Sequence, residues 1–372
     1  MTEALMSQLG QQIRMQSIAV WGSRNAVHLV GCSDRLMQAQ KKLVRFAQVD
    51  SPVLITGESG VGKELFAKAL YLLSTRCGKP FLSINCAQYQ NENLLVSEIF
   101  GHKRGSFTGA AADHQGLFEA ADGGVLFLDE VGELTMQAQA MLLRALSEGE
   151  IRQLGGTRAR HVDVRVVAAT NRPLWQMVEE KTFRADLYYR LRYLHVQVPP
   201  IRQRDDDWRL LARFFLSLMA RRHQSLKQFA PAAWTMLQEY AWPGNVREIR
   251  SIVDAGYCLA DGEVIEPLDF AEFLDRRQAS GTDGAAAADE QAFTAHQYTA
   301  MLEEGVDFWR AVREPFLDRE LNRAQVQAIV KRGLEDANGS YKKMLDIFQV
   351  QQDDYLKFMD FLRHHRLKPE RS

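Results

Sequence analysis

The sequence predicts an α/β fold, in which a parallel sheet of five strands is flanked by helices and followed by helical regions. Five short apolar runs predict the strands, because each is rich in branched residues and bounded by Gly, Pro, Asn or acidic residues. Helical patterns lie between several runs, and apolar strands that alternate with helices are typical of a parallel sheet covered on both faces. The runs lie at residues 52–56, 81–84, 125–128, 164–169 and 194–198.

The composition is that of an ordinary globular chain of 372 residues, with 46% hydrophobic and 25% charged residues. Its 46 Lys and Arg nearly balance 47 Asp and Glu, so any nucleic-acid site would have to be local. The N-terminus does not have the pattern of a secretory signal, and no apolar run approaches the roughly 20 residues that span a bilayer. The cysteines have no metal-ligand spacing. We therefore expect a cytoplasmic protein with reduced thiols and no membrane partner.

A phosphate-binding loop follows the first predicted strand and precedes a helical run. In GESGVGKE, Gly57, Gly62 and Lys63 have the spacing G-x-x-x-x-G-K. The glycines let backbone N–H groups turn toward a β-phosphate, Lys63 reaches the β- and γ-oxygens, and the helix N-terminus adds its dipole. Glu64 stands where Ser or Thr normally places a hydroxyl on Mg²⁺. The predicted nucleotide-binding residues are Gly57, Glu58, Ser59, Gly60, Val61, Gly62, Lys63 and Glu64.

Two adjacent carboxylates end the third predicted strand, in GGVLFLDE. Asp129 is suited to hold Mg²⁺, and Glu130 is suited to activate an attacking water. A solvated turn after a strand is the alternative, but the phosphate loop favours hydrolysis. The fourth strand ends in Thr170 and Asn171, which are placed to position a γ-phosphate, although such residues are also common in turns.

A helical block follows from about residue 206 to residue 274. WPGN at 242–245 interrupts it, because Pro and Gly end one helix and Asn245 can cap the next. Residues 276–292 are small and polar and predict a flexible linker, since Gly281 and Gly284 disfavour the alternative of an alanine-rich helix.

Together these segments resemble one family, the AAA+ ATPases that activate sigma-54 RNA polymerase, known as bacterial enhancer-binding proteins. The resemblance covers about residues 29–274. GESGVGKE is similar to the family's Walker A motif, which also carries Glu after the Lys, and GGVLFLDE is similar to Walker B. GHKRGSFTGA at 101–110 resembles the loop that engages the client, usually written GAFTGA. FRADLYYRL resembles the arginine-finger segment, and WPGNVRE resembles the sensor II motif.

The resemblance implies a role for each matching residue. Asn85 matches the switch that controls the catalytic glutamate, and Asn171 matches sensor I. Arg184 and Arg190 match fingers that reach the ATP of a neighbouring subunit, which implies a homo-oligomeric ring, expected to be a hexamer. Arg247 matches sensor II, which reaches from a helical lid toward the phosphates by paired hydrogen bonds.

The resemblance also implies a sigma-54 contact formed by Gly105, Ser106, Phe107, Thr108, Gly109 and Ala110. Phe107 and Thr108 would engage the sigma factor, while the glycines let the loop move. Ser106 replaces the family's usual Ala and preserves a small side chain. Residues 148–165 would form a second, pore-facing loop, with a plain surface hairpin as the alternative.

Residues 293–372 predict a helical C-terminal domain. Residues 325–365 have the period of three helices and resemble the Fis-type helix-turn-helix that ends many family members. In the expected recognition helix, Asp353 and Asp354 would face DNA phosphates with like charge. Enhancer-DNA binding and a protein-interaction role therefore both stay open. The apolar pattern before residue 320 predicts internal packing or a dimer contact.

We expect an activator that hydrolyses ATP with Mg²⁺ in a ring and remodels the closed sigma-54 polymerase–promoter complex. A remodelling ATPase with another client, or an interaction protein whose ATPase has lapsed, are the alternatives. The chain starts about thirty residues before the ATPase segment, so we expect control by a regulatory protein in trans or by the C-terminal region. The expected parts are an extension (1–28), an ATPase subdomain (29–205), a helical lid (206–275), a linker (276–292) and the C-terminal domain (293–372).

Overall fold

The structure is a computed structural model that describes residues 5–89, 92–107, 110, 112–278, 307–313, 316, 323–337, 340–351 and 354–364. Thr108 and Gly109 of the predicted contact loop lie outside the described residues, as do Asp353 and most of the predicted linker. The chain divides into two compact units, Met1–Ala271 and Glu272–Ser372. None of the described helices combines the length and the apolar character of a membrane span.

Five parallel strands form the sheet of the first unit, in the order β2-β3-β6-β1-β7. The central strand β1 pairs with both β6 and β7, and Val53 lies opposite Val167 and Leu194. The strands are β1 (Val53–Thr56), β2 (Phe81–Asn85), β3 (Val125–Asp129), β6 (Arg165–Thr170) and β7 (Leu194–Gln197). Each coincides with one of the five apolar runs, so the predicted parallel sheet is confirmed.

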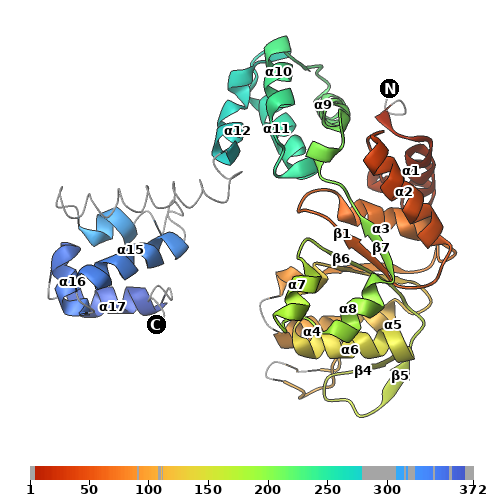
Figure 1. The fold of residues 1–372 in the computed structure, drawn as a ribbon, viewed down its shortest axis with the longest axis horizontal. Helices are drawn as coiled ribbons and strands as arrows, with labels where there is room; N and C mark the ends of the chain where they lie inside the picture. Colours follow the sequence, from red (N-terminus) through yellow and green to blue (C-terminus); the bar gives the residue numbers. More distant parts are fainter. Residues whose placement is uncertain are drawn as a thin grey trace. The chain divides into compact units, whose positions relative to one another are not determined.

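Helices cover both faces of this sheet (Figure 1). Because successive side chains of a strand point to opposite faces, Val53 and Ile55 belong to one core cluster and Leu54 belongs to the other. One cluster includes α1 (Gln8–Trp21), α2 (Asp34–Ala47) and α3 (Lys63–Leu72). The other includes α4 (Glu92–Phe100), α5 (Leu117–Ala120), α6 (Met136–Glu148), α7 (Leu174–Glu179) and α8 (Ala185–Arg192). Two packed cores thus hold the ends of the strands in place.

A surface hairpin follows α6. Its strands, β4 (Glu150–Arg152) and β5 (Ala159–His161), pair antiparallel. Gly149 ends α6 in the left-handed conformation, with φ of +67°, which turns the chain into the hairpin. The sequence leaves a second loop or a hairpin open for residues 148–165, and the backbone is a hairpin.

A helical subdomain, the lid, follows the sheet and contains α9 (Asp207–His223), α10 (Pro231–Glu239) and α11 (Asn245–Leu259) (Figure 1). Two short strands, β8 (Gln228–Phe229) and β9 (Val264–Ile265), pair beside these helices. Tryptophan rings fill its core, and Trp208 lies 5.9 Å from Trp234 and 6.1 Å from Trp242 between ring centroids. α12 (Ala271–Gln278) comes next in the chain.

Two buried charged residues fix the connection between the sheet and the lid. The Arg204 guanidinium donates to Pro199 O at 2.7 Å and to Val61 O at 2.9 Å. Asp207 accepts from the Ser33 hydroxyl at 2.7 Å and from its backbone N–H at 3.1 Å. Burial lowers the pKa of Arg204 to about 10, while Asp207 opposes this shift. Because buried charges need partners, these contacts hold the start of the lid against the sheet domain.

The predicted helix cap at Asn245 is wrong. Gly244 is the N-cap residue of α11, and Asn245 is the first helical residue, with φ of +53°. Glu248 Oε2 accepts from Gly244 N–H at 2.6 Å and thereby satisfies the amide of the N-cap residue. The Asn245 side chain is consequently available for contacts outside its own helix.

The second unit contains α15 (Arg323–Asp336), α16 (Tyr341–Ile347) and α17 (Tyr355–His364), preceded by a π-helical turn at Trp309–Arg313. Ser340 Oγ accepts from Lys343 N at 3.4 Å and caps α16. Aromatic rings form the core, with Phe308 stacked on Phe348 at 5.3 Å and edge-on to Phe358 at 4.9 Å. Phe308 therefore takes part in internal packing, as one of the two predicted alternatives has it.

Candidate functional site

The phosphate loop turns between β1 and α3 on glycines with positive φ. Gly60 and Gly62 have φ of +77° and +100°, which side chains rarely adopt. A Cβ on Gly60 would lie 2.5 Å from Gly244 O, so this part of the loop touches the lid. Lys63 begins α3, is 7% exposed, and donates to the carbonyls of the first two loop residues at 3.0 and 3.3 Å. The loop is therefore folded around the ammonium group.

The two carboxylates lie next to this ammonium group. Glu130 has φ of +52°, its Oε1 lies 3.4 Å from Lys63 Nζ, and its Oε2 accepts from Asn171 N–H at 3.2 Å. Burial raises the pKa of Asp129, the charge of Glu130 adds to the rise, and Lys63 opposes it. Lys63, both acids and the end of β6 thus converge, as the sequence predicts.

A cavity of about 350 Å³ opens in front of these groups, between the loop, the end of β3 and the lid. It is lined by Ser59, Gly60, Gly62, Lys63, Glu64, Leu65, Asp129, Glu130, Phe215, Val246, Arg247 and Arg250. Arg247 Nη1 donates to Ser59 Oγ at 3.0 Å. Lysine, two arginines and a helix N-terminus suit a polyphosphate, and two carboxylates suit Mg²⁺, so the residues fit both groups.

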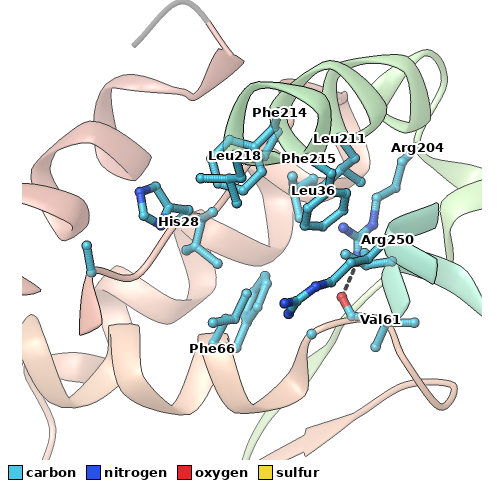
Figure 2. Close-up of a pocket in the computed structure, with 16 residues that line it drawn as sticks. His28, Leu36, Val61, Phe66, Arg204, Leu211, Phe214, Phe215, Leu218 and Arg250 are labelled. Carbon is cyan, nitrogen blue, oxygen red and sulfur yellow. Dashed lines mark hydrogen bonds between the residues drawn. The ribbon is translucent and has the colours of Figure 1, made fainter. Parts of the chain in front are cut away.

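An apolar cavity of about 200 Å³ adjoins the first (Figure 2). The two share five lining residues: Gly62, Leu65, Phe215, Val246 and Arg250. Figure 2 shows the side chains of Phe66 on one side, the α9 residues Leu211, Phe214 and Leu218 on another, and His28 at one end. A phosphate-binding region that opens into an apolar pocket has the form of a nucleotide site.

His28 and Arg250 are among the residues that line the apolar cavity and were not predicted as site residues. His28 lies 5.0 Å from Phe214 between ring centroids. Burial lowers the pKa of His28, and the nearby positive charge of Arg14 lowers it further, so the ring is neutral near pH 7. Arg250 lies one turn after Arg247 and so faces the same way on α11. That spacing was the available sequence signal for Arg250, whereas nothing in the sequence marks His28.

The strand pairing places Asn85 beside the two acids, but its side chain forms a hydrogen bond elsewhere. Asn85 pairs with Asp129 across β2 and β3. Its Oδ1 accepts from Ala87 N–H at 2.9 Å and caps a short 3₁₀ turn. Glu130 is held instead by Lys63 and the Asn171 backbone.

The two predicted finger residues do not line the cavity that contains Lys63: Arg190 lies on α8, and Arg184 is the N-cap residue of that helix. Arg184 pairs with Asp186, with N···O distances of 2.8 and 3.1 Å. Arg190 donates to Leu146 O at 2.8 Å and borders a separate open cavity of about 850 Å³ between α6 and α8. The structure therefore does not bring these arginines to the phosphate loop of their own chain.

The described part of the predicted contact loop is tied to the surface hairpin. Lys103 N–H donates to Leu154 O, and Leu154 N–H donates to Gly101 O, both at 2.9 Å. The half-buried Phe107 ring packs edge-on against His102 at 5.1 Å. Ala110 O accepts from the Gly105 amide at 2.9 Å, which closes the base of the loop.

Ser106 sits where this loop meets the hairpin. Its Oγ is buried and has no hydrogen-bond partner among the described residues. A Cβ on Gly155 would lie 2.8 Å from Ser106 Cβ. The small side chains of both residues thus let the two segments come together.

Residues 29–197 match the Sigma-54 interaction domain family, and residues 202–287 match the AAA+ ATPase lid domain family. The chain is 45% identical over 258 residues to the DNA-binding transcriptional activator HyfR of Escherichia coli (strain K12), a match that covers 69% of this chain and 38% of HyfR. It is 44% identical over 248 residues to a Nif-specific regulatory protein of Rhizobium leguminosarum bv. trifolii, covering 67% of this chain and 70% of that protein.

The fold is similar to the crystal structure of NtrX from Brucella abortus in complex with ATP. The TM-score is 0.63 at 27% sequence identity, and the match covers 92% of this chain and 70% of NtrX. The matches to both domain families follow one another along the chain, over the sheet domain and the lid that enclose the site. The chain belongs to the family of sigma-54 enhancer-binding activators, in which a sigma-54 interaction domain is followed by an AAA+ lid.

Proposed function

We propose that this protein hydrolyses ATP and uses the released energy to activate sigma-54 RNA polymerase at a closed promoter complex. The observation that carries the proposal is the cavity in which the phosphate loop, two acids and two lid arginines meet. ATP with Mg²⁺ supplies the phosphoanhydride bond whose cleavage drives the conformational cycle. The similar NtrX structures were solved in complex with ADP and with ATP, which supports nucleotide binding by this fold.

In this proposal, loop residues 57–64 and Arg247 bind the phosphates, and the apolar cavity receives the base. Asp129 holds Mg²⁺, which would reverse the unfavourable effect of burial on its charge. Lys63 exchanges Glu130 for a phosphate oxygen, which leaves the Glu130 carboxylate free to accept a proton from the attacking water. Asn171 positions the γ-phosphate beside that water.

The fingers Arg184 and Arg190 serve the ATP of a neighbouring subunit in a ring, expected to be a hexamer. Support comes from their position, because Arg190 on α8 and Arg184 at its N-cap both lie outside their own chain's phosphate cavity. Asn85 responds to the nucleotide state at the adjacent strand end. A separate subunit is needed to complete each site.

The loop at 101–110 is the contact to sigma-54, and Phe107 and Thr108 are the residues that engage it. Support comes from the half-buried Phe107, which belongs to the loop rather than to the main core clusters. Its contact with His102 describes a resting position from which the ring can be released. The hydrogen bonds to the hairpin make residues 148–165 the segment that moves with it.

The Phe107→Ala variant tests this function. It should abolish transcription by sigma-54 polymerase in vitro while ATP hydrolysis stays within about twofold of the parent, because Phe107 does not line the nucleotide cavity. Each protein is measured with a promoter template, sigma-54 polymerase and ATP. Glu130→Gln is the matched control and should lose both activities.

Transcription by Phe107→Ala at the parent level would show that the client is not sigma-54 or that another surface contacts it. An absence of ATP hydrolysis by the parent would point to an interaction protein instead. Removing residues 293–372 in the same assay measures what the C-terminal domain contributes, including any control exerted through it.

The C-terminal domain, at 293–372, is the proposed site of enhancer-DNA binding or of protein interaction. Lys357 on α17 lies 3.8 Å from Asp354 and 4.7 Å from the Trp309 ring centroid. These contacts occupy one cation of the expected recognition helix, which favours a protein partner, such as a regulator acting in trans.

The protein is expected to work in the cytoplasm, with an extension (1–28), a sheet domain (29–205), a lid (206–275) and a linker (276–292).

A further inference from the structure

One buried amide joins three segments around the phosphate loop. Asn245, the first residue of α11, has an exposed fraction of 0% and φ of +53°. Asn tolerates this backbone conformation better than most residues, but a buried side-chain amide needs hydrogen-bond partners. The contacts of its side chain are therefore informative about the role of this position.

The two atoms of the amide bind different parts of the molecule. Asn245 Oδ1 accepts from Ile201 N–H at 2.9 Å, in the short 3₁₀ turn between β7 and the lid. Its Nδ2 donates to Glu58 Oε2 and to Ser59 O, both at 3.1 Å. The amide thus links the lid, the turn that connects it to the sheet, and the phosphate loop.

The carboxylate of Glu58 is itself held by the connecting turn. Both of its oxygens accept from the Arg202 guanidinium, and one of these N···O distances is 2.7 Å. The Arg202 contact holds the pKa of Glu58 below its usual range, burial opposes this, and Asn245 adds to the lowering. Glu58 therefore remains an ionised acceptor for the Asn245 amide at neutral pH.

The same turn of α11 places the sensor II arginine. Arg247 N–H donates to Gly60 O at 3.3 Å, and its guanidinium donates to Ser59 Oγ at 3.0 Å. Asn245 and Arg247 therefore contact the same loop from one turn of α11. Any displacement of the lid that breaks the Asn245 contacts also moves Arg247 away from the phosphate cavity.

We propose that Asn245 is a positioning residue that clamps the lid to the phosphate loop and so places Arg247 for nucleotide binding. The proposal rests on the nucleotide site described above. It assigns Glu58 and Arg202 as the partners through which the clamp is formed. Asn245 acts through these residues and does not line the phosphate cavity.

Asn245→Asp tests the clamp with almost no change in shape. The variant can still accept from Ile201, but it loses the donor and puts a second carboxylate beside Glu58. Its KM for ATP and its Kd for a fluorescent ATP analogue should rise about tenfold or more, since the lid is then free to move. Adding Glu58→Gln supplies a donor from the opposite side and should recover part of the affinity.

A lid variant of equal structural severity is the control. Leu237→Ala truncates a fully buried side chain of α10 that lines neither cavity, and should leave the KM for ATP within about twofold. In an Arg247→Ala background, Asn245→Asp should have little further effect, because the clamp acts by placing that arginine. The proposal would be overturned if the double variant raised the KM for ATP by the product of the two single effects. It would also be overturned if Asn245→Asp alone left the KM unchanged.

Amide hydrogen exchange without nucleotide separates this proposal from the proposed ATPase function. The Arg247 amide should exchange faster in Asn245→Asp than in the parent, and should be unaffected in Leu237→Ala. Unchanged exchange would mean that Asn245 does not hold the lid. If the Arg247 amide exchanged faster in Asn245→Asp than in the parent, but the parent bound no ATP, the clamp would stand and the proposed function would fail.

Discussion

At the scale of single residues, Asp129 combines an unfavourable position with a functional need. Burial raises its pKa, and the adjacent Glu130 raises it further. A carboxyl group whose pKa is higher in the folded than in the unfolded protein lowers stability as the pH rises above the unfolded pKa, and the full loss is reached above the folded pKa. Without bound Mg²⁺, the charge of Asp129 therefore lowers stability at neutral pH.

Asn in place of Asp129 should stabilise the protein when no nucleotide or Mg²⁺ is present. The free energy of unfolding of Asp129→Asn should exceed that of the parent at pH 8, and the difference should shrink as the pH falls toward 4. Thermal unfolding across this pH range, in buffers without divalent cations, measures the effect. A variant less stable than the parent at pH 8 would contradict the argument, while loss of ATP hydrolysis is expected in either case.

The contact that Arg250 makes with a bound nucleotide can be located by comparing the affinities for ATP, ADP, AMP and adenosine. Arg250 lines both cavities, and its side chain extends into the apolar one in Figure 2. A group at that boundary would contact the first phosphate rather than the last. Arg250→Ala should weaken ATP, ADP and AMP by a similar factor of about ten or more, as expected for a hydrogen bond to a charged group. Adenosine binding should not change in equilibrium titrations.

The control for Arg250 is its neighbour on the helix. Arg250 Nε lies 3.6 Å from Asp254 Oδ2, so removal of the arginine also breaks this ion pair. Asp254→Asn breaks the pair and keeps the arginine, and should leave AMP affinity at the parent level. Equal losses in both variants would mean that the ion pair matters and that Arg250 makes no contact with the nucleotide.

At the scale of elements, the described part of the loop at 101–110 packs against the β4–β5 hairpin. Gly155 has φ of +70°, and a Cβ there would lie 2.8 Å from Ser106 Cβ. Gly155→Ala should therefore displace the contact loop and lower transcription at least severalfold, with ATP hydrolysis preserved. Both activities are measured on the same preparation, since only their ratio reports the displacement.

Backbone strain alone must be separated from this displacement. Gly123 has φ of +74°, and a Cβ there meets no atom within 4 Å. Gly123→Ala should cost a similar amount of stability, on the order of 1 kcal/mol, without affecting the loop. Comparable transcription by the two alanine variants would show that contact with Ser106 has no effect on the loop.

Elements were predictable where a local pattern is enough to define them. Five apolar runs identify the five strands, and the spacing of Gly57, Gly62 and Lys63 identifies the loop after the first strand. The Asn245 prediction failed because capping assumes a local partner, whereas its amide binds residues about 44 and 187 positions away. His28 was not predictable, because a histidine acquires its surroundings only when α9 packs over it.

At the scale of the whole molecule, the proposed mechanism takes residues of each catalytic site from two subunits. The phosphate cavity holds Lys63, Glu130 and the lid arginines, whereas Arg184, the N-cap residue of α8, and Arg190, on α8, lie outside it. An arginine that acts on the ATP of another subunit makes activity depend on assembly. Two inactive variants with complementary defects can test this dependence directly.

Mixing such variants should restore ATP hydrolysis. Glu130→Gln keeps both arginines but cannot activate water, and the double variant Arg184→Ala/Arg190→Ala keeps Glu130 but lacks fingers. Each protein alone should be nearly inactive. In rings assembled from equal amounts, about a quarter of the sites combine an intact glutamate with a neighbour's arginines, which sets the upper limit of recovery. If the arginines served their own subunit, no site in the mixture would be complete, and hydrolysis would stay at the level of the separate variants.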